Sequence, residues 1–222
     1  MGELWTITLL TVGMAAIATL IMLPPGLLLA WALARGRFRG RVLLETFVSL
    51  PLVMPPVATG LILLMLLAPR GVLGGVLANL GIEIVFTWKA VVIAMAVMGL
   101  PLLVRTARAG FEQVDRRYEQ VASTLGANPL RVFLTVTLPL ALPSVMAAAV
   151  LCFARAIGEF GATMMIAGSI PGSTRTLAVA IYSFAETGRD TQAAQLVLVS
   201  AAIAFAALAL SNWIAARSGL RT

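Results

Sequence analysis

The sequence predicts an all-α, polytopic integral membrane protein with about five transmembrane helices, its N-terminus outside and its C-terminus in the cytoplasm. Hydrophobic residues make up 60% of the 222 residues, charged residues make up 11%, and mean hydropathy is +1.00. Because so few polar residues cannot cover a water-exposed surface, lipid is the expected solvent. Several uncharged runs also exceed the roughly 20 residues that cross a bilayer as a helix.

Five spans follow one another along the chain. Four of them are defined by uncharged runs, at Leu4–Ala34, Thr46–Pro69, Val132–Ala154 and Thr191–Ala216. The other extends Ala90–Val104 backward through Ile84–Trp88, with Lys89 and Arg105 placed to snorkel. The predicted spans are 5–34, 44–68, 84–107, 139–167 and 191–216, within one transmembrane domain over residues 1–222.

Prolines and glycines modify these spans. Pro24-Pro25, Pro51, Pro55-Pro56, Pro101, Pro139 and Pro143 fall within or at the ends of four of them. Proline kinks a helix, so kinked spans are expected. The glycine-rich stretch Gly71–Ile82 is too short to cross the membrane and predicts a small external loop or helix. The first span lacks a basic leading segment and is interpreted as a retained helix, not as a signal peptide.

The basic residues predict the orientation. Eleven follow the first, third and fifth spans, and four lie in the other two loops. The larger set is Arg35, Arg37, Arg39, Arg41, Arg105, Arg108, Arg116, Arg117, Arg131, Arg217 and Arg221; the smaller set is Arg70, Lys89, Arg175 and Arg189. Cytoplasmic loops carry the excess of Lys and Arg, so the loop at 108–138 is expected in the cytoplasm. The net charge of +7 thus indicates a lipid bilayer as partner, not nucleic acid.

The residue inventory excludes several classes of chemistry. The chain has no histidine and one cysteine, Cys152, which excludes His-based catalysis, a disulfide framework and a thiolate zinc site. It has no nucleotide-binding Gly-Lys motif, and its one lysine, Lys89, lies in an external context. We therefore expect no catalytic residue, metal or cofactor in this subunit.

The cytoplasmic loop is predicted to be a helix–turn–helix. Phe111–Gly126 has apolar residues at helical spacing. Gly126 suits a left-handed stop, Asn128 an N-cap and Pro129 the first turn of a second helix that Pro139 limits. On these features alone, an amphipathic connector resting on lipid headgroups remains an alternative.

The spacing in this loop resembles the cytoplasmic EAA loop of binding-protein-dependent ABC importers. The matching positions are Gln120, Val121, Ala122, Gly126, Val136, Leu138 and Pro139. Gln120 replaces the usual glutamate and Glu119 precedes it, an arrangement that resembles the molybdate branch. The resemblance implies a loop that docks on a separate ATPase through Glu119, Gln120, Val121, Ala122, Gly126, Asn128, Pro129, Leu138 and Pro139. ATP and magnesium would be bound by that ATPase.

A second candidate site lies in the fourth span, where Arg155 and Glu159 are four residues apart. Ionisable residues at that depth require a partner or a polar interior. They form either an internal pair that satisfies its own burial or part of a translocation path. Gly158 and Gly161 would allow close helix approach at a subunit seam, with Thr163 beside them.

The region around this pair resembles molybdate and tungstate permeases. The matching segments are Gly158–Thr163, Gly168, Ile170–Gly172, Thr174–Thr176, Ala180–Tyr182, Leu50–Gly60 and Gly99–Arg108. The resemblance covers about residues 5 to 215. It implies a type I ABC importer permease fold in the cytoplasmic (inner) membrane. It also implies a homodimer with a second permease copy, two ATPase subunits and an external oxyanion-binding protein.

The loop before the fifth span offers candidate external contacts, namely Ser173, Thr174, Arg175 and Thr176. Cationic and hydroxyl donors attract a dianion. They equally suit a docking surface for the binding protein, or simple solvation.

The sequence therefore predicts a permease subunit that imports molybdate or tungstate and is not itself an enzyme. A permease for sulfate or another oxyanion is the alternative. A secondary transporter or channel is disfavoured because no internal repeat is present. A membrane enzyme is disfavoured because acidic residues do not cluster.

Overall fold

The computed structural model describes residues 2–36 and 38–217, and their regular structure is helical throughout. The helices are α1 (Gly2–Arg35), α2 (Arg41–Val53), α3 (Pro56–Leu67), α4 (Val72–Asn79), α5 (Trp88–Gln113), α6 (Arg116–Thr124), α7 (Pro129–Val132), the π-helical turn η1 (Phe133–Thr137), α8 (Leu138–Ile157), α9 (Gly161–Ala167), α10 (Leu177–Glu186) and α11 (Asp190–Arg217). The all-α prediction is confirmed.

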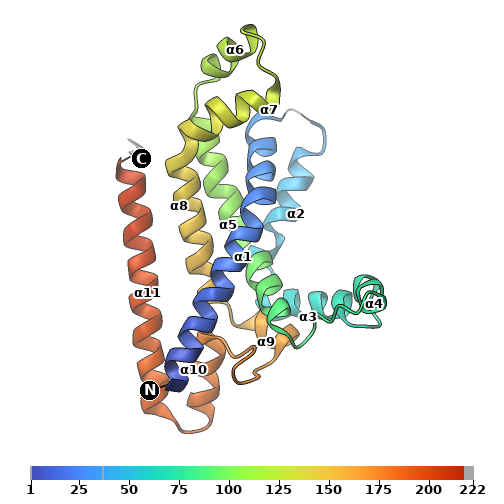
Figure 1. The fold of residues 1–222 in the computed structure, drawn as a ribbon, viewed down its shortest axis with the longest axis vertical. Coiled ribbons are helices and arrows are strands. Elements are labelled where there is room, and N and C mark those ends of the chain that lie inside the picture. Colours follow the sequence, from blue (N-terminus) through green and yellow to red (C-terminus); the bar gives the residue numbers. More distant parts are fainter. Residues whose placement is uncertain (1, 37, 218–222) are drawn as a thin grey trace.

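The bundle is built around α5, which packs between α1 and α8, while α11 packs on α8 and α2 on α5 (Figure 1). α1, α5, the continuous run Pro129–Ile157 and α11 are each long and apolar enough to cross a bilayer. Glycines bring α5 and α8 close together: a Cβ added to Gly99 would lie 2.7 Å from the Cys152 sulfur. Small residues at such crossings favour helix association within lipid.

The span expected at 44–68 is divided into α2 and α3, which are bent by 111°. The break lies at Met54 and Pro55, whose ψ angles of 145° and 130° are extended. A residue before proline is forced out of the helical region, and here both Met54 and Pro55 precede a proline. As a result α3, together with α4, points sideways from the bundle (Figure 1).

The span expected at 139–167 is also divided, because α8 ends at Ile157 and α9 begins at Gly161. At its other end this span begins earlier than predicted. Pro139 does not limit the preceding helix: α7 continues through η1 into α8, and the Leu138 N–H bonds the Phe133 carbonyl. The π-helical turn widens the backbone just where proline would otherwise clash with the preceding turn.

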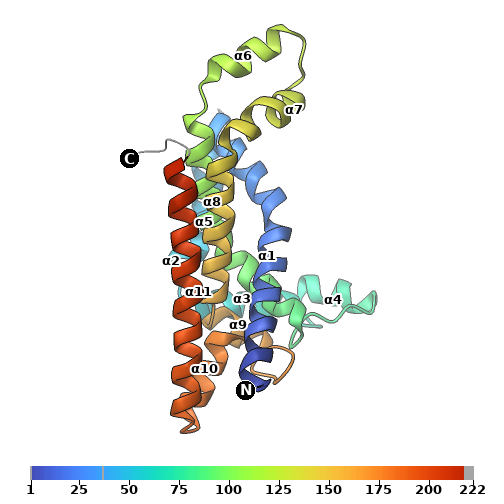
Figure 2. The ribbon, with the colours of Figure 1, turned by 60° about the vertical axis from the view of Figure 1, so that its left-hand side comes forward.

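The loop between α5 and α8 extends from one end of the bundle, opposite the N-terminus and at the same end as the last turn of α11 (Figures 1 and 2). This arrangement agrees with the predicted orientation. Arg37 and Arg221, which contributed to that prediction, lie outside the described residues. The helix predicted over 111–126 is interrupted, since Asp115 caps α6 by accepting a hydrogen bond from the Arg117 N–H at 2.9 Å.

α3 and α9, the two short helices that follow the breaks, pack closely on each other. A Cβ added to Gly60 would lie 2.7 Å from the Ala162 Cα and 2.8 Å from its carbonyl oxygen. On the other side of the contact, a Cβ added to Gly161 would lie 2.9 Å from the Pro56 Cβ. The predicted close approach at Gly161 is therefore made to α3 of the same chain.

We expect Gly60→Ala to destabilise the protein by about 1–3 kcal/mol, because backbone atoms of α9 cannot move aside by a change of rotamer. Gly13→Ala is the matched control, since nothing lies within 4 Å of the added Cβ and alanine favours a helix. Thermal unfolding in detergent measures both variants. Equal midpoints would contradict the close packing of α3 on α9.

Candidate functional site

The turn between α6 and α7 has the predicted local structure. Gly126 has a φ angle of +84°, which confirms the left-handed stop. The Asn128 side chain accepts a hydrogen bond from the Arg131 N–H at 2.8 Å, and Pro129 occupies the first turn of α7. Each residue thus has the conformation that its type favours, and the two helices are joined at a defined angle.

The loop carries an exposed apolar surface. Its large exposed apolar side chains are Tyr118, Val121, Leu125, Leu130 and Leu134. A hollow of about 790 Å³ lies between α6 and the run from η1 into α8. Its lining is Tyr118, Val121, Ala122, Leu125, Thr135, Val136, Pro139 and Leu140. Exposed apolar surface of this kind is typical of a contact with a partner or a membrane surface. Gln120 is also exposed, whereas Glu119 is half-buried.

Glu119 is held by residues from two other elements. The Arg35 Nη2 atom lies 3.0 Å from Glu119 Oε1, and Arg35 Nε donates to the same oxygen at 3.1 Å. Thr137 Oγ1 also donates to it, at 2.7 Å. Sequence reasoning missed Arg35 and Thr137 as site residues. Arg35 is 84 positions from Glu119, so no spacing in the sequence signals the contact.

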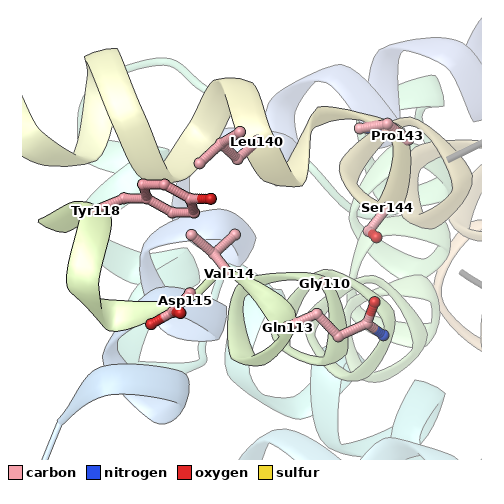
Figure 3. Close-up of a pocket in the computed structure, with 8 residues that line it drawn as sticks. All are labelled: Gly110, Gln113, Val114, Asp115, Tyr118, Leu140, Pro143 and Ser144. Atoms are coloured by element: carbon pink, nitrogen blue, oxygen red, sulfur yellow. The ribbon is translucent and has the colours of Figure 1, made fainter. Parts of the chain in front are cut away.

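A second hollow lies under the start of α6, where Tyr118 projects toward Leu140 of α8 and above Val114 (Figure 3). It has a volume of about 310 Å³ and is lined by Gly110, Gln113, Val114, Asp115, Tyr118, Leu140, Pro143 and Ser144. The start of α6 is therefore separated from the ends of α5 and α8 by space.

Arg155 and Glu159 form an ion pair, with 2.8 Å between Arg155 Nη1 and Glu159 Oε2. They do not lie on one helix as expected, because Glu159 follows the end of α8. Its other oxygen, Oε1, accepts a hydrogen bond from the Ala162 N–H at 2.8 Å and caps α9. The Glu159 side chain is 1% exposed, and that of Arg155 is 28% exposed. The buried carboxylate thus has a charged partner and a backbone partner, as a buried charge requires.

A small cavity of about 290 Å³ adjoins this pair at the point where both helix breaks meet. Its lining is Pro56, Val57, Arg155, Gly158, Glu159, Phe160 and Gly161. Gly158 is exposed at this cavity. Thr163, by contrast, is fully buried in α9, and its hydroxyl has no hydrogen-bond partner among the described residues. The structure brings together four of the five residues predicted for this site.

The external loop differs from its prediction. Thr174 and Thr176 are fully buried, so their hydroxyls do not face outward in this structure. Thr174 Oγ1 accepts a hydrogen bond from the Ile170 N–H at 3.0 Å, which closes the loop on itself. Arg175 donates to Ser169 at 3.1 Å and lies 3.9 Å from Glu3. Ser173 is half-buried. Thr174 and Arg175 thus hold the loop together, while the buried Thr176 hydroxyl has no hydrogen-bond partner among the described residues.

We expect Arg155→Gln and Glu159→Gln each to lower the yield of folded protein, and the double variant to recover more of it than either single change. Removing one partner of a buried ion pair costs about 3–5 kcal/mol because the other charge is left uncompensated. A glutamine in place of Glu159 retains a side-chain oxygen that can accept from the Ala162 N–H, so the cap would remain. A double-mutant cycle on monodisperse yield by size-exclusion chromatography measures the coupling. Strictly additive losses would show that the two side chains act independently.

Comparison with known proteins gives independent evidence on the class of this protein. Residues 22–219 match the family of binding-protein-dependent transport system inner membrane components. The molybdenum transport system permease protein ModB of Escherichia coli (strain K12) is 45% identical over 213 residues, which is 95% of this chain and 93% of that protein. ModB of Haemophilus influenzae is 42% identical over 94% of this chain and 92% of its own length.

Two further similarities are more distant. The sulfate transport system permease protein CysT of Salmonella typhimurium is 38% identical over 80% of this chain and 63% of its own length. The crystal structure of a bacterial alginate ABC transporter with a pentasaccharide-bound periplasmic protein contains a chain with a TM-score of 0.73 at 17% identity. The match covers 98% of this chain and 80% of that one, and it shows the shared fold.

Three findings lead to the same assignment. They are the extent of the family match, the agreement with permeases over nearly the whole chain, and the type I permease fold. This chain belongs to the family of binding-protein-dependent transport system inner membrane components, the permease subunits of ABC importers.

Proposed function

We propose that this protein is the permease subunit of an ATP-driven importer of molybdate, with tungstate as a second substrate. The observation that carries the proposal is the 45% identity to a molybdenum permease over 95% of this chain. Molybdate and tungstate are tetrahedral dianions of similar size, so one path serves both. The match to the sulfate permease covers 80% of this chain, compared with 95% for the molybdenum permease. Sulfate is therefore the second candidate substrate.

The proposed translocation path passes the cavity at Arg155, Gly158, Glu159 and Gly161. Arg155 lines this cavity and is the partly exposed member of its ion pair, and guanidinium N–H groups suit an oxyanion. Glu159 offsets the positive charge, and a dianion is therefore attracted without being held tightly. Uptake in the Arg155→Gln, Glu159→Gln double variant distinguishes two roles: recovered folding without uptake assigns the pair to translocation, and recovered folding with uptake makes it structural.

The loop from α6 through α7 is proposed to dock on a separate ATPase that binds ATP and magnesium. Its exposed apolar surface and its capped turn suit a stiff contact that transmits movement. Two permease copies, two ATPase subunits and an external oxyanion-binding protein would complete the importer. The binding protein would supply the tight selection of substrate, because a permease that bound it tightly would release it slowly.

Reconstitution tests this function. The permease is co-purified with its ATPase, placed in liposomes and supplied with the binding protein and radiolabelled molybdate. We expect molybdate uptake to require ATP, the ATPase and the binding protein. Excess tungstate should suppress this uptake more strongly than excess sulfate. Preferential competition by sulfate would favour the second candidate. Uptake without the ATPase would indicate a secondary transporter and overturn the proposal.

Gly126→Val is expected to abolish most ATP-dependent uptake while the complex still assembles and hydrolyses ATP. A β-branched residue at a φ angle of +84° is strained by about 1–3 kcal/mol, and the turn relieves this strain by changing the angle between α6 and α7. Gly126→Asn is the matched control, since asparagine tolerates the left-handed region. Uptake and ATP hydrolysis are measured on the same proteoliposomes. Normal uptake by Gly126→Val would show that the angle is unimportant.

A further inference from the structure

The helix α6 has little apolar packing to hold it against the bundle. None of its nine residues, all of which are described, is buried. One hollow lies beneath its first turn (Figure 3) and another lies along its side. Apolar packing holds a helix in place only weakly when the helix buries so little apolar surface. Its place therefore depends to a large extent on directional polar contacts.

Those contacts converge on the carboxylate of Glu119. Arg35, in the last turn of α1, donates to Oε1 at 3.1 Å, and Thr137, at the end of η1, donates to the same oxygen at 2.7 Å. Arg35 Nη2 also donates to the Val114 carbonyl at 2.7 Å, at the junction of α5 and α6. Three helical elements and the α5–α6 junction thus meet in one hydrogen-bonded cluster, called here the Glu119 cluster. Its members are Arg35, Val114, Glu119 and Thr137.

We propose that Arg35 and Thr137 are positioning residues that make α6 move together with α1 and α8. The inference rests on the proposed function, in which the loop receives movement from the ATPase. When α6 is displaced, the Glu119 cluster transfers the displacement to the end of α1 through Arg35 and to the start of α8 through Thr137. Without the cluster, α6 would move over the hollows beside it and the membrane helices would not follow.

The cluster is suited to this role because it is shielded from water. The Arg35 and Glu119 side chains are 13% and 18% exposed. Charge-assisted hydrogen bonds are roughly twice as strong as neutral ones, whereas fully exposed ion pairs contribute little. Arg35 also uses its planar fork to reach Glu119 and Val114 at once, which a lysine ammonium does not reproduce. Its positive charge at the C-terminus of α1 is further favoured by the helix dipole.

Arg108 provides a matched comparison at the same end of the bundle. It pairs with Glu45 at 2.7 Å and with Glu112 at 2.8 Å, and so joins α5 to α2. Neither partner lies in α6, α7 or η1. Removing this arginine therefore deletes ion pairs and one positive charge near the same membrane surface, but leaves the Glu119 cluster intact.

The test compares Arg35→Gln, Arg35→Lys, Thr137→Val and Arg108→Gln in the complete importer. For each, molybdate uptake and ATP hydrolysis are measured on the same proteoliposomes, and the ratio of the two is reported per assembled complex. We expect the ratio to fall on the order of tenfold in Arg35→Gln, from loss of the charge-assisted bonds. It should fall less in Thr137→Val and in Arg35→Lys, and remain unchanged in Arg108→Gln.

A merely structural role would lower the amount of complex and leave the ratio unchanged. Thr137→Val retains the shape of the side chain, so it tests the inference even if Arg35→Gln assembles poorly. A wild-type ratio in both Thr137→Val and Arg35→Lys, or an equal fall in Arg108→Gln, would overturn the inference. Failure of the unmodified importer to couple uptake to ATP would instead overturn the proposed function, so the two failures are distinguishable.

Discussion

Backbone N–H groups inside this bundle need partners within the protein, because lipid offers none. The effect is clearest where helices break. After α8, Glu159 satisfies both the Arg155 charge and the free Ala162 N–H. At the start of α10, the Thr11 hydroxyl of α1 accepts a hydrogen bond from the Leu177 N–H at 2.8 Å. At these two points a side chain replaces a missing helical bond. The bend between α2 and α3 has no side-chain cap, and there Pro56 occupies the first turn of α3 with no N–H to satisfy.

The two candidate regions meet this constraint differently. Around the cavity, α3 and α9 are held together by close contact at Gly60 and Gly161, and the Arg155–Glu159 pair joins the end of α8 to the start of this unit. The loop outside the bundle has water available and leaves much of its apolar surface exposed. Within it, α6 depends largely on the Glu119 carboxylate, whereas η1 is held by the packing of Phe133 on Trp31 and Phe111. In the proposed importer, α6 would receive movement from the ATPase through these polar contacts, whereas α3 and α9 would stay together.

Local signals in the sequence were sufficient where conformation is decided locally. Gly126, Asn128 and Pro129 each predicted their own backbone geometry, and composition predicted the helical membrane class. The sequence also indicated a kink at Pro55-Pro56, but not a bend of 111°, because that angle depends on the packing of α3 against α9. No sequence signal indicates the break after Ile157, because the four-residue spacing of Arg155 and Glu159 equally suits one continuous helix, and the bond of Glu159 to the Ala162 N–H appears only in the fold. The contact between Arg35 and Glu119 depends on the position of the end of α1 relative to α6. No local sequence pattern predicts that position.

The position of α8 explains how events at the two regions are related. Thr137, which contacts Glu119, immediately precedes α8, and Arg155 lies in its last turn. The 20 residues of this helix span about 30 Å. The close contact of α8 with α5 at Gly99 and Cys152 restricts the directions in which α8 can move. The break that follows Ile157 then allows the end of α8 to shift relative to α9, which is held on α3. In the proposed mechanism, a displacement at the loop would therefore change the geometry at the Arg155–Glu159 pair, where the two halves of the broken span meet.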